Sequence, residues 1–152
     1  MTDWLSDDEQ RAWRRVVSGS RRLLAQLDGE LKCHGLNHDD YGVLVALADA
    51  PDDRLRMGDL ADAVAESRSR LSHHIARMER QGLVARQSCP EDRRGSWAVL
   101  TPAGRGLLES TAPSHVAGVR RWLVDLLEPD ELALLGDVFA RVDDHLREAG
   151  SP

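Results

Sequence analysis

The chain has 152 residues and a formal net charge of −6; 41% of its residues are hydrophobic and 30% are charged, which indicates a folded globular protein and excludes a disordered one. No apolar run approaches the ~20 residues of a membrane-crossing helix, and the acidic N-terminus lacks signal-peptide character, so we expect no membrane partner. Two cysteines, Cys33 and Cys89, give no disulfide framework and favour a reducing, cytoplasmic location.

The first predicted element is one long helix over residues 4–35. Ser6 and Glu9 fit a capping box, with acidic residues in the first turn where the helix dipole favours them, and Gly35 ends the helix. Apolar residues recur through it at helical spacing: Trp13, Val16, Val17, Leu23, Leu24, Leu27 and Leu31. A small neighbouring domain cannot cover so long an apolar face, so we expect it to pair with a second copy of the chain.

The next predicted elements are two helices in quick succession. Asn37 is expected to cap a helix that carries Asp39 and Asp40 in its first turn and stops at Pro51. A short apolar-periodic run over residues 58–64 follows it. Ala65 and Glu66 then make a tight connection to another helix.

This later helix is expected to begin at Ser67, whose hydroxyl caps it, and to end at Gly82. Leu71, Ile75 and Met78 form its apolar stripe, while its opposite face is polar and cationic, with Arg68, Ser69, Ser72, His73, Arg77 and Arg80. Two helices joined by a tight turn, the second with such an outer face, are typical of a helix-turn-helix.

A β-hairpin is predicted directly after this helix. Residues 83–88 form one strand and residues 96–100 its return, joined by a turn-rich segment with adjacent arginines at 93 and 94. A helix followed by a charged hairpin indicates a winged helix, which places the helix in a major groove and the hairpin tip in an adjacent minor groove.

The charge distribution agrees with a DNA partner despite the acidic total. Residues 66–105 hold eight arginines against four acidic residues, a net charge of +4, which leaves −10 for the rest of the chain. A local basic surface of this kind neutralises phosphates and gives salt-dependent DNA affinity.

Two more helices are predicted after the hairpin. Thr101 as cap and Pro102 at the first helical position mark the start of the first, and the apolar run extends to Leu127. Pro113 lies inside this run and is expected to bend or break the helix. Pro129 opens a final amphipathic helix, with Leu132, Leu135, Val138, Phe139, Val142 and Leu146.

Three motifs, G-L-V-x-R at residues 82–86, D-R-R-G at 92–95 and V-L-T-P-A-G at 99–104, resemble the MarR family of bacterial transcriptional regulators. The resemblance implies a mainly α (α+β) fold in a single domain, 1–152. In it, a winged helix-turn-helix over residues 37–101 is flanked by dimerisation helices at 1–36 and 102–150. It also implies that residues 55–57 form a short strand paired with the hairpin.

The DNA contacts are expected on the helix that begins at Ser67 and on the wing. Hydroxyls reach phosphates and bases, and arginine can read guanine, so the predicted major-groove residues are Ser67, Arg68, Ser69, Arg70, Ser72, His73 and Arg77. Ser67 as a cap only remains an alternative, as does a surface ion pair of Arg77 or Arg80 with Glu79 or Glu66. His74 lies beside the apolar stripe and fits a satisfied buried histidine better.

In the wing, Arg94 is the predicted minor-groove residue, and Arg93 is the second choice. The resemblance implies that Asp92 holds a wing arginine in a bidentate salt bridge. Arg86 is either a phosphate contact or a salt-bridge partner. A two-fold homodimer would place two recognition helices about 34 Å apart, which predicts an inverted-repeat operator in double-stranded DNA.

The resemblance further implies a small anionic or phenolic effector between the dimerisation and DNA-binding parts. The candidate lining residues are Trp13, His38, Tyr41 and His115, with Arg120 as an anion partner, and a plain core or surface role is equally open for each. Cys33, His34 and His38 lie near one another in sequence but have no second ligand cluster, so we expect neither metal nor cofactor.

The leading hypothesis is therefore a homodimeric repressor that an effector releases from DNA. One alternative is an architectural DNA binder without sequence preference. Another is a thiol-based redox sensor, for which Cys89, near three arginines, is better placed than Cys33 at a helix C-terminus. We expect no enzyme, because Ser72 and His73 are helical neighbours whose side chains diverge by about 100°, and no glycine-rich phosphate loop is present. A pure protein-interaction module leaves the arginine-tipped hairpin unexplained.

Overall fold

The computed structural model describes residues 3–89 and 92–150, with the backbone alone for residues 92–94. Six α-helices, two short 3-10 helices and three strands occupy these residues, in the order α1 (Asp7–Lys32), α2 (His38–Ala48), η1 (Pro51–Asp53), β1 (Arg54–Arg56), α3 (Met57–Ala63), α4 (Arg68–Arg80), β2 (Val84–Cys89), β3 (Asp92–Leu100), α5 (Pro102–Trp122), η2 (Val124–Leu126) and α6 (Pro129–Glu148). The fold is the predicted one, mostly helical with a small sheet.

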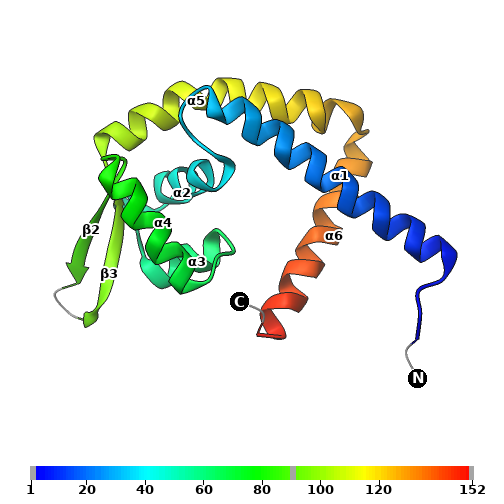
Figure 1. Cartoon of the computed structure of the whole chain (residues 1–152), viewed down its shortest axis with the longest axis horizontal. Coiled ribbons are helices and arrows are strands. Elements are labelled where there is room, and N and C mark those ends of the chain that lie inside the picture. Colours follow the sequence, from blue (N-terminus) through cyan, green and yellow to red (C-terminus); the bar gives the residue numbers. More distant parts are fainter. Residues whose placement is uncertain (1–2, 90–91, 151–152) are drawn as a thin grey trace.

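The helices α1 and α5 form a long antiparallel-looking pair at one side of the molecule, and α2, α3, α4 and the sheet form a compact unit at one end of this pair. Figure 1 shows α1 and α5 running side by side along the molecule, with α2, α3, α4 and the sheet gathered beneath one end of α5. From the other end, α6 turns back toward the compact unit. This division matches the expected separation of flanking helices from a central winged unit.

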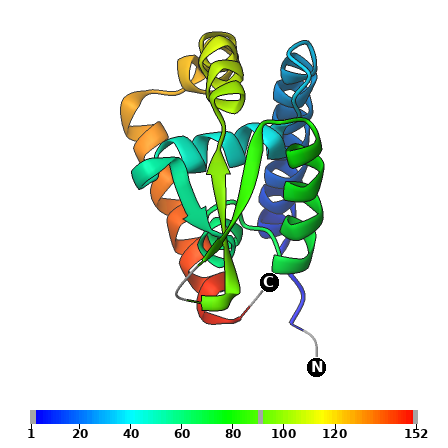
Figure 2. The same cartoon turned by 90° about the vertical axis from the view of Figure 1, so that its left-hand side faces the viewer.

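The sheet is antiparallel, and β3 lies between β1 and β2, as Figure 2 shows. Trp97 on β3 faces Arg56 on one side and Gln87 on the other. The return strand begins at Asp92, four residues before the predicted Ser96, which corrects that prediction. A register shift at Ser88 and Cys89 pairs Cys89 with Asp92, so strand pairing continues almost to the end of the hairpin.

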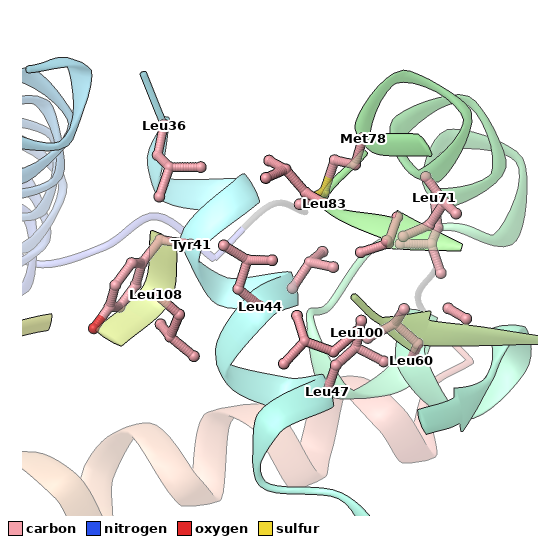
Figure 3. Packing of buried hydrophobic residues seen from close by; sticks show 14 of the residues in the cluster. Leu36, Tyr41, Leu44, Leu47, Leu60, Leu71, Met78, Leu83, Leu100 and Leu108 are labelled. Atoms are coloured by element: carbon pink, nitrogen blue, oxygen red, sulfur yellow. The ribbon is translucent and has the colours of Figure 1, made fainter. Parts of the chain in front are cut away.

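One core holds the compact unit together (Figure 3). The stripe of α4, formed by Leu71, Ile75 and Met78, is completely buried as predicted, and it packs with Leu44 and Leu47 of α2 among other residues. Burial of side chains of this size stabilises the fold by roughly 1.5–3 kcal/mol each. The packing fixes which face of α4 points away from the protein.

The helix boundaries follow from the predicted caps. Ser6 with Glu9 and Asn37 with Asp40 form capping boxes, and the hydroxyl of Ser67 accepts a hydrogen bond from the Arg70 N–H. Gly82, with a φ of 75°, follows α4 in the left-handed conformation that glycine tolerates. The long helix α1 is shorter than predicted at both ends: Ser6 caps its start, and it ends at Lys32, with Cys33 as its C-cap and Gly35 in the left-handed conformation two residues later.

Pro113 does not break α5, which runs without interruption from Pro102 to Trp122. Figure 1 shows α5 as one smoothly arched helix, bent rather than broken. Within the described residues, no helix is both long and apolar enough to span a membrane.

Candidate DNA-binding site

The outward face of α4 carries exposed polar side chains beside the hairpin. Arg68, Ser69, His73 and Arg80 are all exposed, while the opposite side of the helix is sealed into the core. Among the described residues, neither Arg68 nor Arg80 lies within ion-pair distance of a carboxylate. These side chains are therefore placed to meet a polyanion without first leaving another partner.

The first turn of α2 holds α4 in place through a set of charged contacts. Asp40 is buried, and it accepts hydrogen bonds from His74 Nε2 at 2.7 Å and from Arg77 Nη1 at 3.1 Å. His74 Nδ1 lies 3.1 Å from a carboxylate oxygen of Glu66, and Arg70 Nη2 donates to Asp39 at 3.1 Å. Residues 70, 74 and 77 are spaced by four and three, so one face of α4 meets α2.

The protonation states of this cluster are fixed by its own geometry. The hydrogen bond with Asp40 raises the pKa of His74 despite the opposing effect of burial, and Glu66 raises it further. Burial alone would raise the pKa of Asp40, but the hydrogen bonds from His74 and Arg77 outweigh it and lower that pKa to about 2. The contact with Asp40 thus favours the protonated form of His74 in the folded chain.

This cluster changes the role expected for two predicted DNA contacts. Arg77 is paired with the buried Asp40, neither with Glu79 nor with Glu66, the partners considered from the sequence. Arg70 is also paired, with Asp39 and more distantly with Glu66, although its side chain stays largely exposed. The prediction that His74 is a satisfied buried histidine is confirmed.

The hairpin is fastened to α4 by Arg86 on β2. The Arg86 guanidinium donates to the backbone carbonyl of Ser72 and lies 3.4 Å from Glu79 Oε2, and the Arg86 N–H donates to Glu79 Oε1 at 2.8 Å. Ser72 is therefore engaged with the wing. Of its two predicted roles, Arg86 fills that of a salt-bridge partner.

Comparisons with known proteins agree with this geometry. Residues 34–95 match the sequence model described as the MarR family. The chain is 47% identical to AbsC, a MarR family transcriptional regulator from Streptomyces coelicolor, over 97% of this chain and 99% of that one, with a TM-score of 0.92. This chain belongs to the MarR family.

Two other relatives extend the comparison. Sco3205, a MarR family regulator from Streptomyces coelicolor solved in complex with DNA, is 41% identical over 96% of this chain and 92% of that one, with a TM-score of 0.93. The HTH-type transcriptional regulator MhqR from Bacillus subtilis is 28% identical, covering 80% of this chain and 82% of MhqR. The chain is thus a DNA-binding MarR family transcriptional regulator.

The predicted wing-tip residues Asp92, Arg93 and Arg94 belong to β3, but their side chains lie outside the described part of the structure. Their roles in this MarR family member stay predictions. Of the two cysteines, Cys33 is exposed and Cys89 is buried. Cys89, which the sequence favours as a redox-sensing thiol, is thus less accessible than Cys33.

Three of the five predicted effector residues come together between α2 and α5. The His115 ring centroid lies 4.3 Å from that of Tyr41 and 5.9 Å from that of His38. Trp13 is not among them, because it lies on the exposed half of α1, about 27 Å along the helix from Leu31. Arg120 donates to Asp125 at 2.8 Å. The structure gives neither Trp13 nor Arg120 a contact with the three rings.

Sequence reasoning missed the function of Asp40, which was read only as a favourable residue in the first turn of a helix. It also missed the contacts that Trp97 makes with Arg54 and Arg56. The spacing of Arg70, His74 and Arg77 on one face was the signal available for the first. No local pattern marks the second, because β1 and β3 are far apart in sequence.

Proposed function

We propose that this MarR family member is a homodimeric repressor that binds an inverted-repeat operator through α4 and the wing and leaves it when a small effector binds. The observation that carries the proposal is the exposed face of α4, locked between the first turn of α2 and the hairpin. A rigid helix with free arginines and hydroxyls can follow the major groove, and the solved DNA complex of Sco3205 supports this use.

Homodimer formation is supported by apolar side chains that a single chain leaves exposed on its flanking helices. On the helices they include Trp13, Val16, Leu24, Trp122, Leu134, Phe139, Val142 and Leu146, and Trp4 and Leu5 continue the exposed apolar side chains just before α1. So many large hydrophobic residues on neighbouring helices mark a surface for a partner rather than for water. A second copy offers the matching face.

Effector binding is supported by buried polar atoms that lack partners. Nδ1 of His38, Nδ1 of His115 and the hydroxyl of Thr111, one turn before His115 on α5, have no hydrogen-bond partner. Buried polar atoms are nearly always bonded, so a ligand or water is expected there. Burial lowers the pKa of His115, and nearby His38 lowers it further. A neutral imidazole beside Tyr41 fits a phenol better than an anion.

Fluorescence anisotropy tests the DNA-binding part of the proposal. The purified protein is titrated into its own upstream intergenic DNA and a scrambled duplex across a salt series. We expect at least ~10³-fold tighter binding to the first duplex. Equal, steeply salt-dependent affinities would instead indicate an architectural DNA binder.

The effector part is tested by adding a panel of substituted phenols and benzoates to the preformed complex. Release is expected with phenols, and a His115→Phe substitution should weaken it, because the ring is kept while its hydrogen-bonding nitrogens are lost. If phenols and benzoates release wild type and variant alike at the same concentrations, the three-ring cluster is not the effector site.

A further inference from the structure

An open groove lies between α4 and the first turn of α2, beside the outward face of α4. Its cationic lining comes from α4: Arg70, His73, Arg77 and Arg80. Two carboxylates also line the groove, that of Glu66, whose side chain is almost fully buried, and that of Asp39, which is exposed. Among the described residues of this groove, Asp39 is therefore the acid that an approaching DNA phosphate would meet directly.

Arg70 lies at the edge of the outward face of α4 rather than at its centre. Ser69, His73 and Arg80 follow one another at spacings of four and seven residues, so they form an outward row, and all three are exposed. Arg70 is turned from Ser69 by about 100°, toward α2. When the outward row of a helix faces base edges in a major groove, its flanks face the sugar–phosphate strands that bound the groove. Arg70 is thus placed for a phosphate rather than for a base.

The contact that Arg70 makes with Asp39 is easily exchanged. Arg70 Nη2 donates to Asp39 Oδ2 at 3.1 Å, and the two side chains keep 69% and 55% of their surfaces exposed. An ion pair so exposed contributes little in water, so a phosphate can take the place of the carboxylate. Arg77 differs, because its partner Asp40 has a side chain only 3% exposed and would be left as an unpaired buried charge.

We propose that Arg70 binds a DNA phosphate and that Asp39 is an intramolecular competitor for its guanidinium, which DNA must displace. The inference rests on the proposed DNA-binding function and adds a residue that limits affinity. The planar fork of arginine matches phosphate oxygens as it matches a carboxylate, so the two acceptors compete for the same N–H groups. A weakened phosphate contact leaves a larger share of the affinity to base contacts, because phosphates carry no sequence.

The test uses the full chain with Asp39→Asn, with Arg70→Gln and with both substitutions together. The control is Asp125→Asn, which removes the same charge from another exposed ion pair, that of Asp125 with Arg120 at 2.8 Å near the end of α5. Anisotropy titrations with the intergenic and scrambled duplexes are repeated at several salt concentrations, and thermal melts check that each variant is folded.

A competitor for a phosphate-binding arginine has a defined signature. Asp39→Asn should tighten binding to both duplexes by the same factor, roughly two- to fivefold per bound chain, because an exposed ion pair no longer has to be broken. Arg70→Gln should weaken binding to both duplexes and make the slope of log affinity against log salt shallower by about 0.9 per bound chain. In the double variant the gain from Asp39→Asn should be lost, since the group for which it competes is gone. Asp125→Asn should change neither affinity nor slope.

Two results would contradict the mechanism itself. The same gain from Asp39→Asn in the presence and absence of Arg70 would show that Asp39 only repels DNA through its charge. A loss of affinity in Arg70→Gln that is confined to the intergenic duplex would show that Arg70 contacts a base. Either result overturns the competition for a phosphate.

The remaining outcomes separate this inference from the proposed function. If wild type prefers the intergenic duplex while Asp39→Asn and Arg70→Gln keep its affinity and salt slope, the competition is wrong and the regulator stands. If wild type binds both duplexes equally and the variants change as expected, the competition stands and the sequence-specific function fails. Absence of binding by wild type and by Asp39→Asn to either duplex overturns both.

Discussion

At the scale of single residues, His74 gives the recognition helix a dependence on pH. Its pKa is raised in the folded chain, chiefly by Asp40, so the protonated form stabilises the fold. This contribution is complete below the unfolded pKa of about 6.5 and is lost as the pH rises through the folded pKa. We therefore expect the thermal stability of wild type to fall relative to that of His74→Gln as the pH is raised from 6.5.

The measurement is a thermal melt of both proteins at closely spaced pH values. His115 is present in both proteins, so the pH dependence that comes from its lowered pKa cancels in the difference between their melting temperatures. Asp40, with a pKa of about 2, loses its contribution only at strongly acid pH. A constant difference between the two melting temperatures across this range would contradict a charged, buried His74.

Two glycines of α5 make a matched pair. A Cβ on Gly104 would collide with the carbonyl oxygen of Leu83 and lie 2.9 Å from Leu100 Cδ1, whereas one on Gly106 would meet nothing within 4 Å. Gly104→Ala should cost about 1–3 kcal/mol of unfolding free energy through overpacking. Gly106→Ala should instead stabilise the exposed helix by roughly 0.5–1 kcal/mol. Denaturant unfolding of both variants measures the contrast between their unfolding free energies. Equal changes in the two variants would show that α5 does not pack closely against Leu83.

At the scale of elements, the contacts between α2 and α4 separate arginines that hold the fold from arginines open to DNA. Arg77 is paired with Asp40, so we infer that it positions α4 rather than neutralising a phosphate. Arg77→Met should lower the unfolding free energy by about 1–3 kcal/mol, because Asp40 loses a charged donor. It should weaken operator binding while leaving the salt slope unchanged. A slope reduced by about 0.9 would show a direct phosphate contact instead.

The sequence predicted these elements well wherever local chemistry decides them. The caps at Ser6, Asn37 and Ser67 and the stripe of α4 were all readable, because each depends on residues within a few positions. The partners of the site were not readable in this way. Asp40 meets Arg77 across 37 positions and Trp97 meets Arg54 across the sheet, so only the packing of elements brings them together.

The same limit explains the effector residues. Tyr41 and His38 share a helix turn, and the packing of α5 against α2 brings His115 onto them. Trp13 and Arg120 are grouped with them in the sequence by residue type alone. The first turn of α2 carries both this cluster and the aspartates that hold α4. A ligand at His38 and Tyr41 would therefore act directly on the helix turn that orients α4. This contact would couple effector binding to DNA binding in the proposed repressor.

At the scale of the whole molecule, the flanking helices α1 and α6 present exposed apolar faces, and we propose that a second copy of the chain covers them. Phe139 lies in the middle of α6 with half of its surface exposed, and Val142 and Leu146 continue its face. We expect sedimentation of wild type at micromolar concentration to give twice the mass of one chain. Phe139→Asp should give a single-chain mass, since a carboxylate in the centre of an apolar interface would be desolvated without a partner. Gln81→Glu, which adds the same charge at an exposed position after α4, should leave the dimer intact.

A single-chain mass for wild type would rule out the homodimer. If wild type and Phe139→Asp are both dimers, the interface does not include this face of α6, and α1 with its exposed Trp13 becomes the surface to change next.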